Sequence, residues 1–253
     1  MKVCMIGGTG LLGSQGAAEL IKRGHEVRAI ALPPLPQGAV LPPEMEIEYG
    51  NFLEMNDDEI KKMFEGCEGF IFAAGVDERV EGPAPIYNLY KKYNIDPVKR
   101  LLKIAKECGV KHCVILGSYF SYFAKARPQM HLTEYHPYIR SRIDQEKVAM
   151  SFADDNFDVA VLELPYIFGT QPGRKPVWVF LVESIRKMPG VTIEASPRFV
   201  LKGGHWCDEC ERKSWNYGQR AKVDPFFAQV WKPLHEDDEL REYPKEVNEL
   251  NIK

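Results

Sequence analysis

Short apolar runs and stretches of helical periodicity alternate along the first three-quarters of the chain. The apolar runs predict β-strands at residues 3–6, 26–32, 45–49, 69–74, 113–116 and 158–164. Apolar positions spaced three and four apart predict helices at residues 15–23, 56–64, 86–108, 138–152 and 177–187, with a kink at Pro97. Strands that alternate with helices favour the α/β class, here a doubly wound parallel sheet with helices on both faces.

Three glycines connect the first predicted strand to the first predicted helix. Gly7, Gly10 and Gly13 follow the apolar run with the spacing G-x-x-G-x-x-G. Glycine lets the chain turn tightly, and the lack of side chains lets a pyrophosphate approach the N–H groups at the start of the helix. The order strand, glycines, helix therefore predicts a dinucleotide-binding turn; the alternative is a tight turn that binds no ligand.

The composition narrows the choice of partners. The chain has 253 residues and a formal net charge of -3, which gives no electrostatic reason to expect nucleic acid or an anionic membrane. It contains no apolar run near the roughly 20 residues of a membrane span, and residues 1–6 lead into a strand rather than a signal peptide. Cys4, Cys67, Cys108 and Cys113 stand singly in apolar segments, so we expect a reduced, cytoplasmic protein.

Six segments, in this order, resemble the short-chain dehydrogenase/reductase superfamily in its extended NAD-dependent epimerase/dehydratase branch. They are GGTGLLG (7–13), FAAG (72–75), YNIDPVKRLLKIAKECGVKH (93–112), VILGS (114–118), YIRSRIDQEK (138–147) and LELPYIFG (162–169). The resemblance implies a Rossmann fold that binds NAD or NADP and a small-molecule substrate. It also implies cofactor contacts from Gly7, Thr9, Gly10, Leu11, Leu12, Gly13, Asn51, Ala73, Ala74, Gly75, Asn94, Arg142, Pro165, Tyr166 and Ile167.

In the same family a tyrosine acts as acid and base, a lysine four residues later supports it, and a serine or threonine follows the fifth strand. A phenol has a reference pKa of about 10, so a neighbouring cation is needed to favour its ionised form at neutral pH. Positions i and i+4 share a helix face, which brings such a cation beside the ring. The resemblance assigns the tyrosine role to Tyr138 and the hydroxyl role to Ser118.

The lysine position of this family is occupied by Arg142. A guanidinium supplies permanent positive charge and can hydrogen-bond ribose hydroxyls, but it cannot relay a proton. The sequence therefore leaves open whether catalysis is retained or weakened.

The second predicted strand leaves the choice between NAD and NADP open. An acidic residue near its end would bind the ribose 2′-hydroxyl, and a basic residue would favour a 2′-phosphate. The strand instead ends Ala-Ile-Ala-Leu-Pro-Pro, with neither. Arg28 lies earlier in the strand, and we interpret it as a solvated charge rather than a phosphate ligand.

Residues 191–253 do not continue the alternating pattern. We predict an NAD(P)-binding domain at residues 1–190, and at 191–253 a loosely ordered segment that is a shortened or atypical substrate lobe, or lies outside the family's original reading frame. His205, Cys207 and Cys210 offer three zinc ligands, but a structural zinc site has four and no second pair follows, so we expect no metal.

Two functions agree with these patterns. The leading one is an NAD(P)-dependent oxidoreductase of the epimerase/dehydratase type, acting on a hydroxyl or carbonyl carbon; the family often takes nucleotide sugars. The alternative, favoured by Arg142 and the unusual C-terminal segment, is a dinucleotide-binding protein without turnover that serves as a regulatory or redox-sensing module. The substrate and the oligomeric state are not determined, and a homodimer is left open.

The boundary near residue 190 can be tested by limited proteolysis. We expect cleavage to occur first within 191–253 and to leave a stable fragment that ends near residue 190, because loosely ordered segments are cut before packed ones. Mass spectrometry of the fragments locates the cuts. Protection of 191–253 as strong as that of the predicted sheet would contradict this division.

Overall fold

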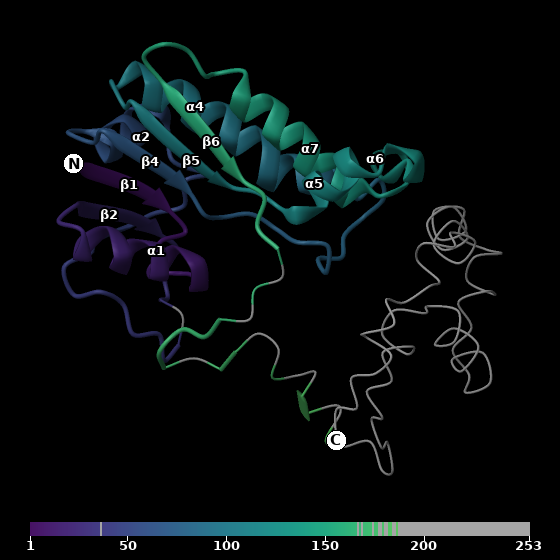
Figure 1. Cartoon of the computed structure of the whole chain (residues 1–253). Helices are drawn as coiled ribbons and strands as arrows, with labels where there is room; N and C mark the ends of the chain where they lie inside the picture. Colours follow the sequence, from purple (N-terminus) through teal and green to yellow (C-terminus); the bar gives the residue numbers. More distant parts are fainter. Residues whose placement is uncertain are drawn as a thin grey trace, which may run out of the picture. The chain divides into compact units, whose positions relative to one another are not determined.

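Six parallel strands form the sheet of this protein, in the order β3-β2-β1-β4-β5-β6 (Figure 1). The computed structural model describes residues 1–35, 37–165, 167, 169–173, 175, 176, 179, 182, 183 and 186. Most of the helix predicted at 177–187 and all of 191–253 lie outside these residues. The strands are β1 (Lys2–Ile6), β2 (Glu26–Ala31), β3 (Glu46–Tyr49), β4 (Gly69–Phe72), β5 (His112–Leu116) and β6 (Asp158–Leu162).

The strand order reverses beside β1. Lys2 pairs with Glu26 of β2 on one side, and Val3 pairs with Gly69 of β4 on the other. The remaining neighbours also pair in parallel. In a doubly wound sheet, ligands bind at the carboxyl ends of the strands on either side of this reversal. The predicted fold class is confirmed.

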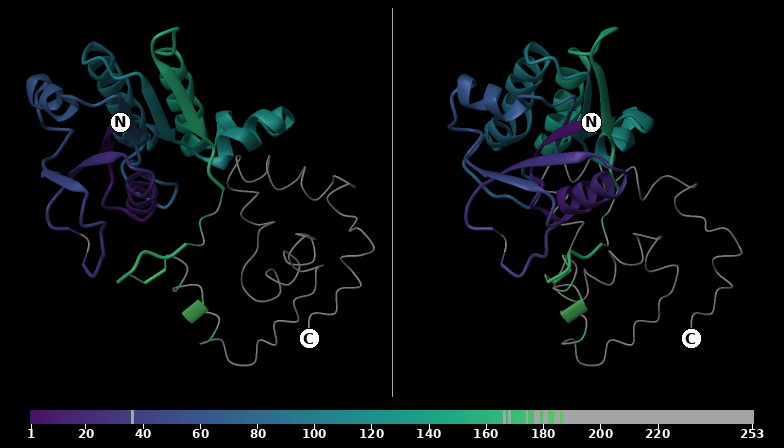
Figure 2. Two further views of the ribbon diagram at one scale, coloured as in Figure 1. Left: turned by 60° about the vertical axis from the view of Figure 1, so that its left-hand side comes forward. Right: turned by 90° about the vertical axis from the view of Figure 1, so that its left-hand side faces the viewer.

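Helices connect the strands and cover both faces of the sheet (Figure 2). In the main unit they are α1 (Leu11–Lys22), α2 (Asp57–Phe64), α3 (Tyr87–Tyr90), η1 (Lys91–Ile95), α4 (Asp96–Glu107), the first part of α5 (Tyr119–Ala126), and α7 (Pro137–Met150). No helix in this described part of the chain is long and apolar enough to cross a membrane.

The two faces of the sheet carry separate apolar clusters. Cys4 and Ile6 pack with residues of α2 and α4, whereas Met5 and Ala29 pack with residues of α1 on the other face. Successive side chains of a strand point to opposite faces, so a sheet covered on both sides needs apolar residues at consecutive positions. This is why residues 3–6 of β1 and 29–31 of β2 are continuous apolar runs in the sequence.

The helix predicted at 86–108 consists of three consecutive segments. Its irregular turn is the π-helical segment η1, and Pro97 lies just after it, in the first turn of α4, where a missing N–H leaves no bond unmade. The irregularity thus begins before the proline rather than at it. Asn94 lies within the π-helical turn and is fully buried, and such turns are frequent at functional sites.

A second unit consists of residues 124–136 and 183–253. In its described part, a 3-10 turn, η2 (Pro128–Met130), precedes a short helix, α6 (Leu132–Tyr135). His131 joins them with a φ of 49°.

Arg28 connects β2 to the end of α2. Its Nε donates to Glu46 Oε2 at 3.1 Å, and its Nη1 donates to three carbonyl oxygens at the end of α2, those of Lys62, Met63 and Glu65. The last carbonyls of a helix lack donors further along it, although Lys62 O also accepts from Glu65 N at 3.2 Å. A cation also suits the negative end of the helix dipole. The interpretation of Arg28 as a solvated charge is therefore wrong: it is a paired residue, and it does not lie near the end of the strand.

The start of α2 is fixed by a capping box, which gives a prediction of stability. The Asn56 side chain accepts from Glu59 N at 3.0 Å, and the Glu59 carboxylate accepts from Asn56 N at 2.7 Å. We expect Asn56→Ala to lower the free energy of unfolding by about 0.5–2 kcal/mol. Denaturant unfolding measures the change. The exposed Lys61→Ala in the same helix is the control, and an equal loss in both variants would contradict the capping role.

Candidate functional site

The turn between β1 and α1 has no space for side chains at two of its glycines. A Cβ on Gly13 would lie 2.1 Å from the carbonyl oxygen of Gly7, and a Cβ on Gly7 would lie 2.4 Å from that of Ala73. Gly7 also has a φ of 83°, which L side chains rarely adopt. These contacts hold the turn directly against the end of β4.

The first turn of α1 is suited to an anion. Gly10 is the N-cap residue and provides no side-chain hydrogen bond, and the first turn contains no acidic residue. The N–H groups at the start of a helix lack partners within the helix and carry the positive end of its dipole. A phosphate group at this position would satisfy both.

A cavity of about 630 Å³ opens beside this helix start. Its wall combines the glycine turn, the ends of β4 and β5, and residues of α5, α7 and the segment after β6. This is a size typical of small-molecule and cofactor sites. The lining includes Gly10, Leu11, Leu12, Gly13, Ala73, Ala74, Gly75, Ser118, Tyr119, Phe120, Phe123, Tyr138, Arg142, Leu164, Pro165 and Ile167.

Asn94 supports the loop after β4 from behind. Its Oδ1 accepts from Val76 N at 2.8 Å, and its Nδ2 donates to Val76 O at 3.0 Å. A Cβ on Gly75, which has a φ of 136°, would lie 2.6 Å from the same Oδ1. The π-helical turn therefore shapes this wall of the cavity, although Asn94 itself does not line it.

Tyr138 and Arg142 lie one turn apart on α7, and both line the cavity. Arg142 Nε donates to Tyr138 Oη at 3.1 Å, and the exposed fractions of the two residues are only 9% and 4%. The Tyr138 ring is held edge-on by Tyr90 and Phe120, with centroids 5.5 Å and 6.2 Å away. A permanent cation is thus fixed beside a phenol whose ring cannot move freely.

Gln145 continues this contact into the protein. Arg142 Nη1 donates to Gln145 Oε1 at 2.8 Å, and Gln145 Nε2 donates to Asn94 O at 2.6 Å. Gln145 is fully buried. Gln145 was not predicted as a site residue. The sequence does place it three residues after Arg142, on the same face of the helix, and this spacing could have indicated the contact.

Ser118 follows β5 on another side of the cavity. Its Oγ accepts from Phe120 N at 3.3 Å, and the residue is 8% exposed. A hydroxyl that accepts from the backbone still has its O–H to donate. Ser118 can therefore donate to an oxygen atom in the cavity.

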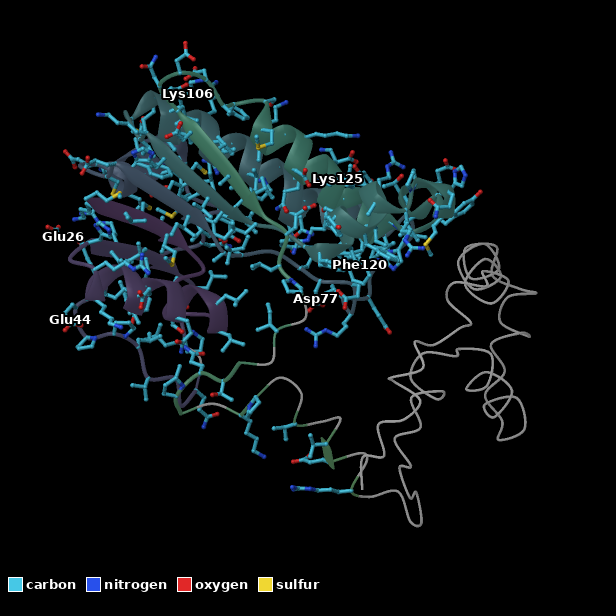
Figure 3. All side chains as sticks on the ribbon, viewed as in Figure 1. Glu26, Glu44, Asp77, Lys106, Phe120 and Lys125 are labelled. Atoms are coloured by element: carbon cyan, nitrogen blue, oxygen red, sulfur yellow. The ribbon has the colours of Figure 1, made fainter. Side chains whose placement is uncertain are left out.

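The rim of the cavity carries charged residues from the loop after β4. Asp77, Glu78 and Arg79 line it, and Arg79 Nε donates to Asp77 Oδ2 at 3.0 Å. Burial raises the pKa of the Asp77 carboxyl, but hydrogen bonds from Arg79 and the charges of Arg79 and Arg142 outweigh it, so the pKa is lowered overall. Figure 3 labels Asp77 and Phe120 beyond the carboxyl ends of the strands, whereas Glu26 and Lys106 lie at the opposite end of the sheet.

A second contact ties α7 to the helix before the π-helical turn. Tyr87 of α3 donates its O–H to Asp144 Oδ2 at 2.5 Å, and the Arg140 guanidinium lies 4.4 Å from the Tyr87 ring centroid. Burial and this hydrogen bond raise the pKa of Tyr87 to about 12. Tyr87 stays protonated and keeps the contact at any physiological pH.

Four of the described residues that were predicted for the site do not line the cavity. Gly7 and Thr9 belong to the glycine turn, and Asn94 lies behind Gly75. Asn51 uses its Oδ1 locally, to accept from Leu53 N at 3.1 Å. Tyr166 lies outside the described residues, as do His205, Cys207 and Cys210; among the described residues, no group of three acidic, histidine or cysteine side chains could hold a metal.

Gln171 is another residue that the sequence analysis missed. Its Nε2 donates to Thr9 O at 3.3 Å and to Ser14 Oγ at 3.1 Å, and it is 2% exposed. Val40 N also donates to Pro172 O at 2.9 Å. The segment after β6 is therefore attached to the glycine turn, through contacts that no local sequence pattern indicates.

Fold and cavity together define a class of protein. A doubly wound parallel sheet, a glycine turn too close-packed for side chains and an open helix start at the strand reversal are the features of a Rossmann-type dinucleotide-binding protein. The family model of the NAD dependent epimerase/dehydratase family matches residues 3–191. The chain belongs to this family, which confirms the resemblance, and the predicted NAD or NADP cofactor agrees with the family's dependence on NAD.

Three solved structures are similar to this chain at low sequence identity. UDP-glucuronic acid 4-epimerase from Bacillus cereus in complex with NAD is 13% identical, with a TM-score of 0.49, and the match covers 68% of this chain and 60% of that protein. The Bordetella bronchiseptica enzyme WbmG in complex with NAD is 18% identical, with a TM-score of 0.49 and coverage of 64% and 52%. The protein gox2253 is 19% identical, with a TM-score of 0.51 and coverage of 64% and 50%.

The matched part of this chain thus spans 50% to 60% of the length of these three proteins. A search of curated protein sequences gives no significant match.

The helix start provides a test of dinucleotide binding. Gly10 has an extended backbone that valine readily adopts, but its Cβ would lie 3.3 Å from the Gly7 carbonyl oxygen, which must shift slightly, so circular dichroism first checks that Gly10→Val is folded. Its branched side chain would project where a pyrophosphate approaches, and we expect it to abolish NAD and NADP binding in calorimetry.

Gly16→Ala is the matched control, because a Cβ there comes no closer than 4.0 Å to another atom. It should bind as the unchanged protein does. Unchanged affinity in a folded Gly10→Val protein would show that the turn does not hold the cofactor.

Proposed function

We propose that this protein is an NAD(P)-dependent oxidoreductase of the epimerase/dehydratase type that acts on a hydroxyl-bearing or carbonyl carbon. The observation that carries the proposal is the buried contact between Arg142 and Tyr138, in the wall of a cavity that also includes the glycine turn. Family membership supports the same reaction class.

The residues of the cavity fit a dinucleotide. In the proposal the pyrophosphate binds at the start of α1, beside Gly10, Leu11, Leu12 and Gly13, where N–H groups are free of side chains. Ala73, Ala74 and Gly75 leave room along the end of β4, and Pro165 and Ile167 bound the opposite wall. A dinucleotide held by these residues would supply a nicotinamide able to accept a hydride from the substrate and return it.

Tyr138 exchanges the substrate proton in this mechanism. Its Oη accepts a hydrogen bond from Arg142 Nε, so the oxygen that takes and gives the proton faces a permanent cation. Ser118, whose Oγ already accepts from Phe120 N, donates its O–H to the substrate oxygen and polarises it.

Arg142 supports the site through its fixed charge. A guanidinium has five N–H donors, and the contacts to Tyr138 and Gln145 engage two of its three nitrogens. The third nitrogen can bind a cofactor ribose hydroxyl. Since arginine does not release its proton, Tyr138 exchanges protons with solvent through the cavity rather than through Arg142.

The proposal covers the division of the chain as well. Residues 1–190 are the NAD(P)-binding domain, supported by a family match that ends at 191, and 191–253 are a short or atypical substrate lobe. The substrate is a small molecule with a hydroxyl or carbonyl group, of which a nucleotide sugar is one example.

A second candidate function is favoured by one residue. Arg142 in place of the family's lysine removes the side chain that relays the proton, which suits a protein that binds the dinucleotide as a regulatory or redox-sensing module without turnover. The two functions share cofactor binding and differ in turnover.

Tyr138→Phe tests the acid/base assignment. We expect it to remove most turnover while leaving NAD affinity nearly unchanged, because the proton donor is lost and the ring still packs against Tyr90 and Phe120. Turnover is followed by product analysis with UDP-glucose and UDP-glucuronic acid as probes, and affinity by calorimetry. An unchanged rate would end the assignment; NAD binding without turnover of any probe would favour the second function.

Substitutions of Arg142 separate charge from proton relay. Arg142→Ala should weaken NAD binding by about 1–3 kcal/mol, the cost of losing a charged hydrogen bond. Arg142→Lys should keep binding and raise turnover, since an ammonium keeps the charge and can relay a proton. Calorimetry and the same turnover assay measure the two effects. NAD binding that Arg142→Ala leaves unchanged would contradict the ribose contact.

A further inference from the structure

Four buried residues form one hydrogen-bonded line that leads away from the cavity. It runs from Tyr138 Oη to Arg142, from Arg142 to the Gln145 side chain, and from Gln145 to the backbone oxygen of Asn94. The exposed fraction is zero for Gln145 and Asn94. The proposed chemistry uses the two members that line the cavity, Tyr138 and Arg142, and gives no role to Gln145.

The contacts of Gln145 define the orientation of its amide. The Asn94 carbonyl can only accept, so the amide NH₂ must face it, and the amide oxygen must therefore face Arg142. In this orientation the amide NH₂ donates to a carbonyl oxygen and the amide oxygen accepts from a guanidinium N–H, so both hydrogen bonds are satisfied. Gln145 thus presents one acceptor to the guanidinium, from a position fixed by the backbone of η1.

A buried guanidinium needs such an acceptor. Taking a cation out of water is costly unless acceptors replace the lost water, and an uncharged amide does this without neutralising the charge. The competing acceptor is the carboxylate of Asp77 on the cavity rim, which is close enough for the Arg142 charge to lower its pKa. Arg142 can be directed to Tyr138 or drawn toward Asp77.

We propose that Gln145 is a positioning residue that directs the guanidinium of Arg142 onto the phenol oxygen of Tyr138. With Nη1 held by Gln145, the planar guanidinium has one orientation, in which Nε points to Tyr138 Oη. A lysine would not need this help, because its ammonium is a compact charge with three rotatable donors. The inference rests on the proposed function, in which Tyr138 is the acid and base.

The test removes the acceptor without removing bulk. Gln145→Met has similar length and no hydrogen-bonding amide, and Gln145→Glu has the same shape but places a negative charge beside Arg142. Ser141→Ala is the control: Ser141 is a fully buried polar residue of the same helix, and its hydroxyl donates to the Tyr138 carbonyl rather than to Arg142.

The first readout is independent of turnover. Ultraviolet difference spectra against Tyr138→Phe report the phenolate formed by Tyr138 at one alkaline pH. Ionisable groups near Tyr138 include Arg142 on α7, Tyr90 on α3 and Arg79 on the rim, with Asp77 and Glu78 beside Arg79. Gln145→Met leaves all of these unchanged, whereas Gln145→Glu adds a carboxylate. We expect clearly less phenolate in Gln145→Met and Gln145→Glu, and no change in Ser141→Ala.

The second readout is a double-mutant cycle with Arg142→Lys. In the Arg142 background we expect Gln145→Met to lower kcat about tenfold, the effect of one lost buried hydrogen bond. In the Arg142→Lys background the same change should cost little, because the ammonium reaches Tyr138 without Gln145. Equal losses in both backgrounds, or a phenolate signal like that of Ser141→Ala, would overturn the positioning role.

The two readouts separate this inference from the proposed function. If no probe substrate is turned over, the phenolate spectra still decide whether Gln145 directs Arg142. If Gln145→Met is not folded by circular dichroism, Gln145→Leu, which also removes the amide and adds no charge, gives the same decision. Normal phenolate in that folded variant would end the proposal.

Discussion

The architecture depends on how closely the first turn of the chain approaches the end of β4. A Cβ on Gly7 would lie only 2.4 Å from the carbonyl oxygen of Ala73, so the turn and the end of β4 meet backbone to backbone. That arrangement places the start of α1 at the reversal of strand order, beside the ends of β4 and β5. The cavity opens beside this packed turn, and its wall includes both the start of α1 and residues of α7.

The second constraint is the buried positive charge of Arg142. Arg142 carries a permanent charge at 9% exposure, and it is stabilised by a phenol oxygen and an amide oxygen rather than by a directly bonded carboxylate. A carboxylate partner would stabilise it more strongly but would cancel its field. Neutral partners keep the positive potential in the cavity, where it acts on whatever oxygen or anion lies next to Tyr138.

The sequence predicted the features that depend on residues close together along the chain. Continuous apolar runs and the glycine spacing predicted the strands, the βα turn and the fold class, and the i, i+4 spacing placed Tyr138 and Arg142 on one helix face. What it missed depends on long-range contacts: Gln145 becomes a partner of Arg142 only because α7 packs on η1, and Arg28 is paired only because α2 ends beside β2. Asn51 does not line the cavity, and its side-chain oxygen instead accepts a hydrogen bond from Leu53 N in a local turn.

The attachment of Gln171 to the glycine turn has a consequence for the order of folding. Its hydrogen bond to Thr9 O joins residues 162 positions apart, and contacts of such separation form late because a long loop must close first. During synthesis the turn leaves the ribosome early, but one of its partners follows only after all six strands. The nascent chain therefore has all six strands of its sheet before the glycine turn acquires this last contact.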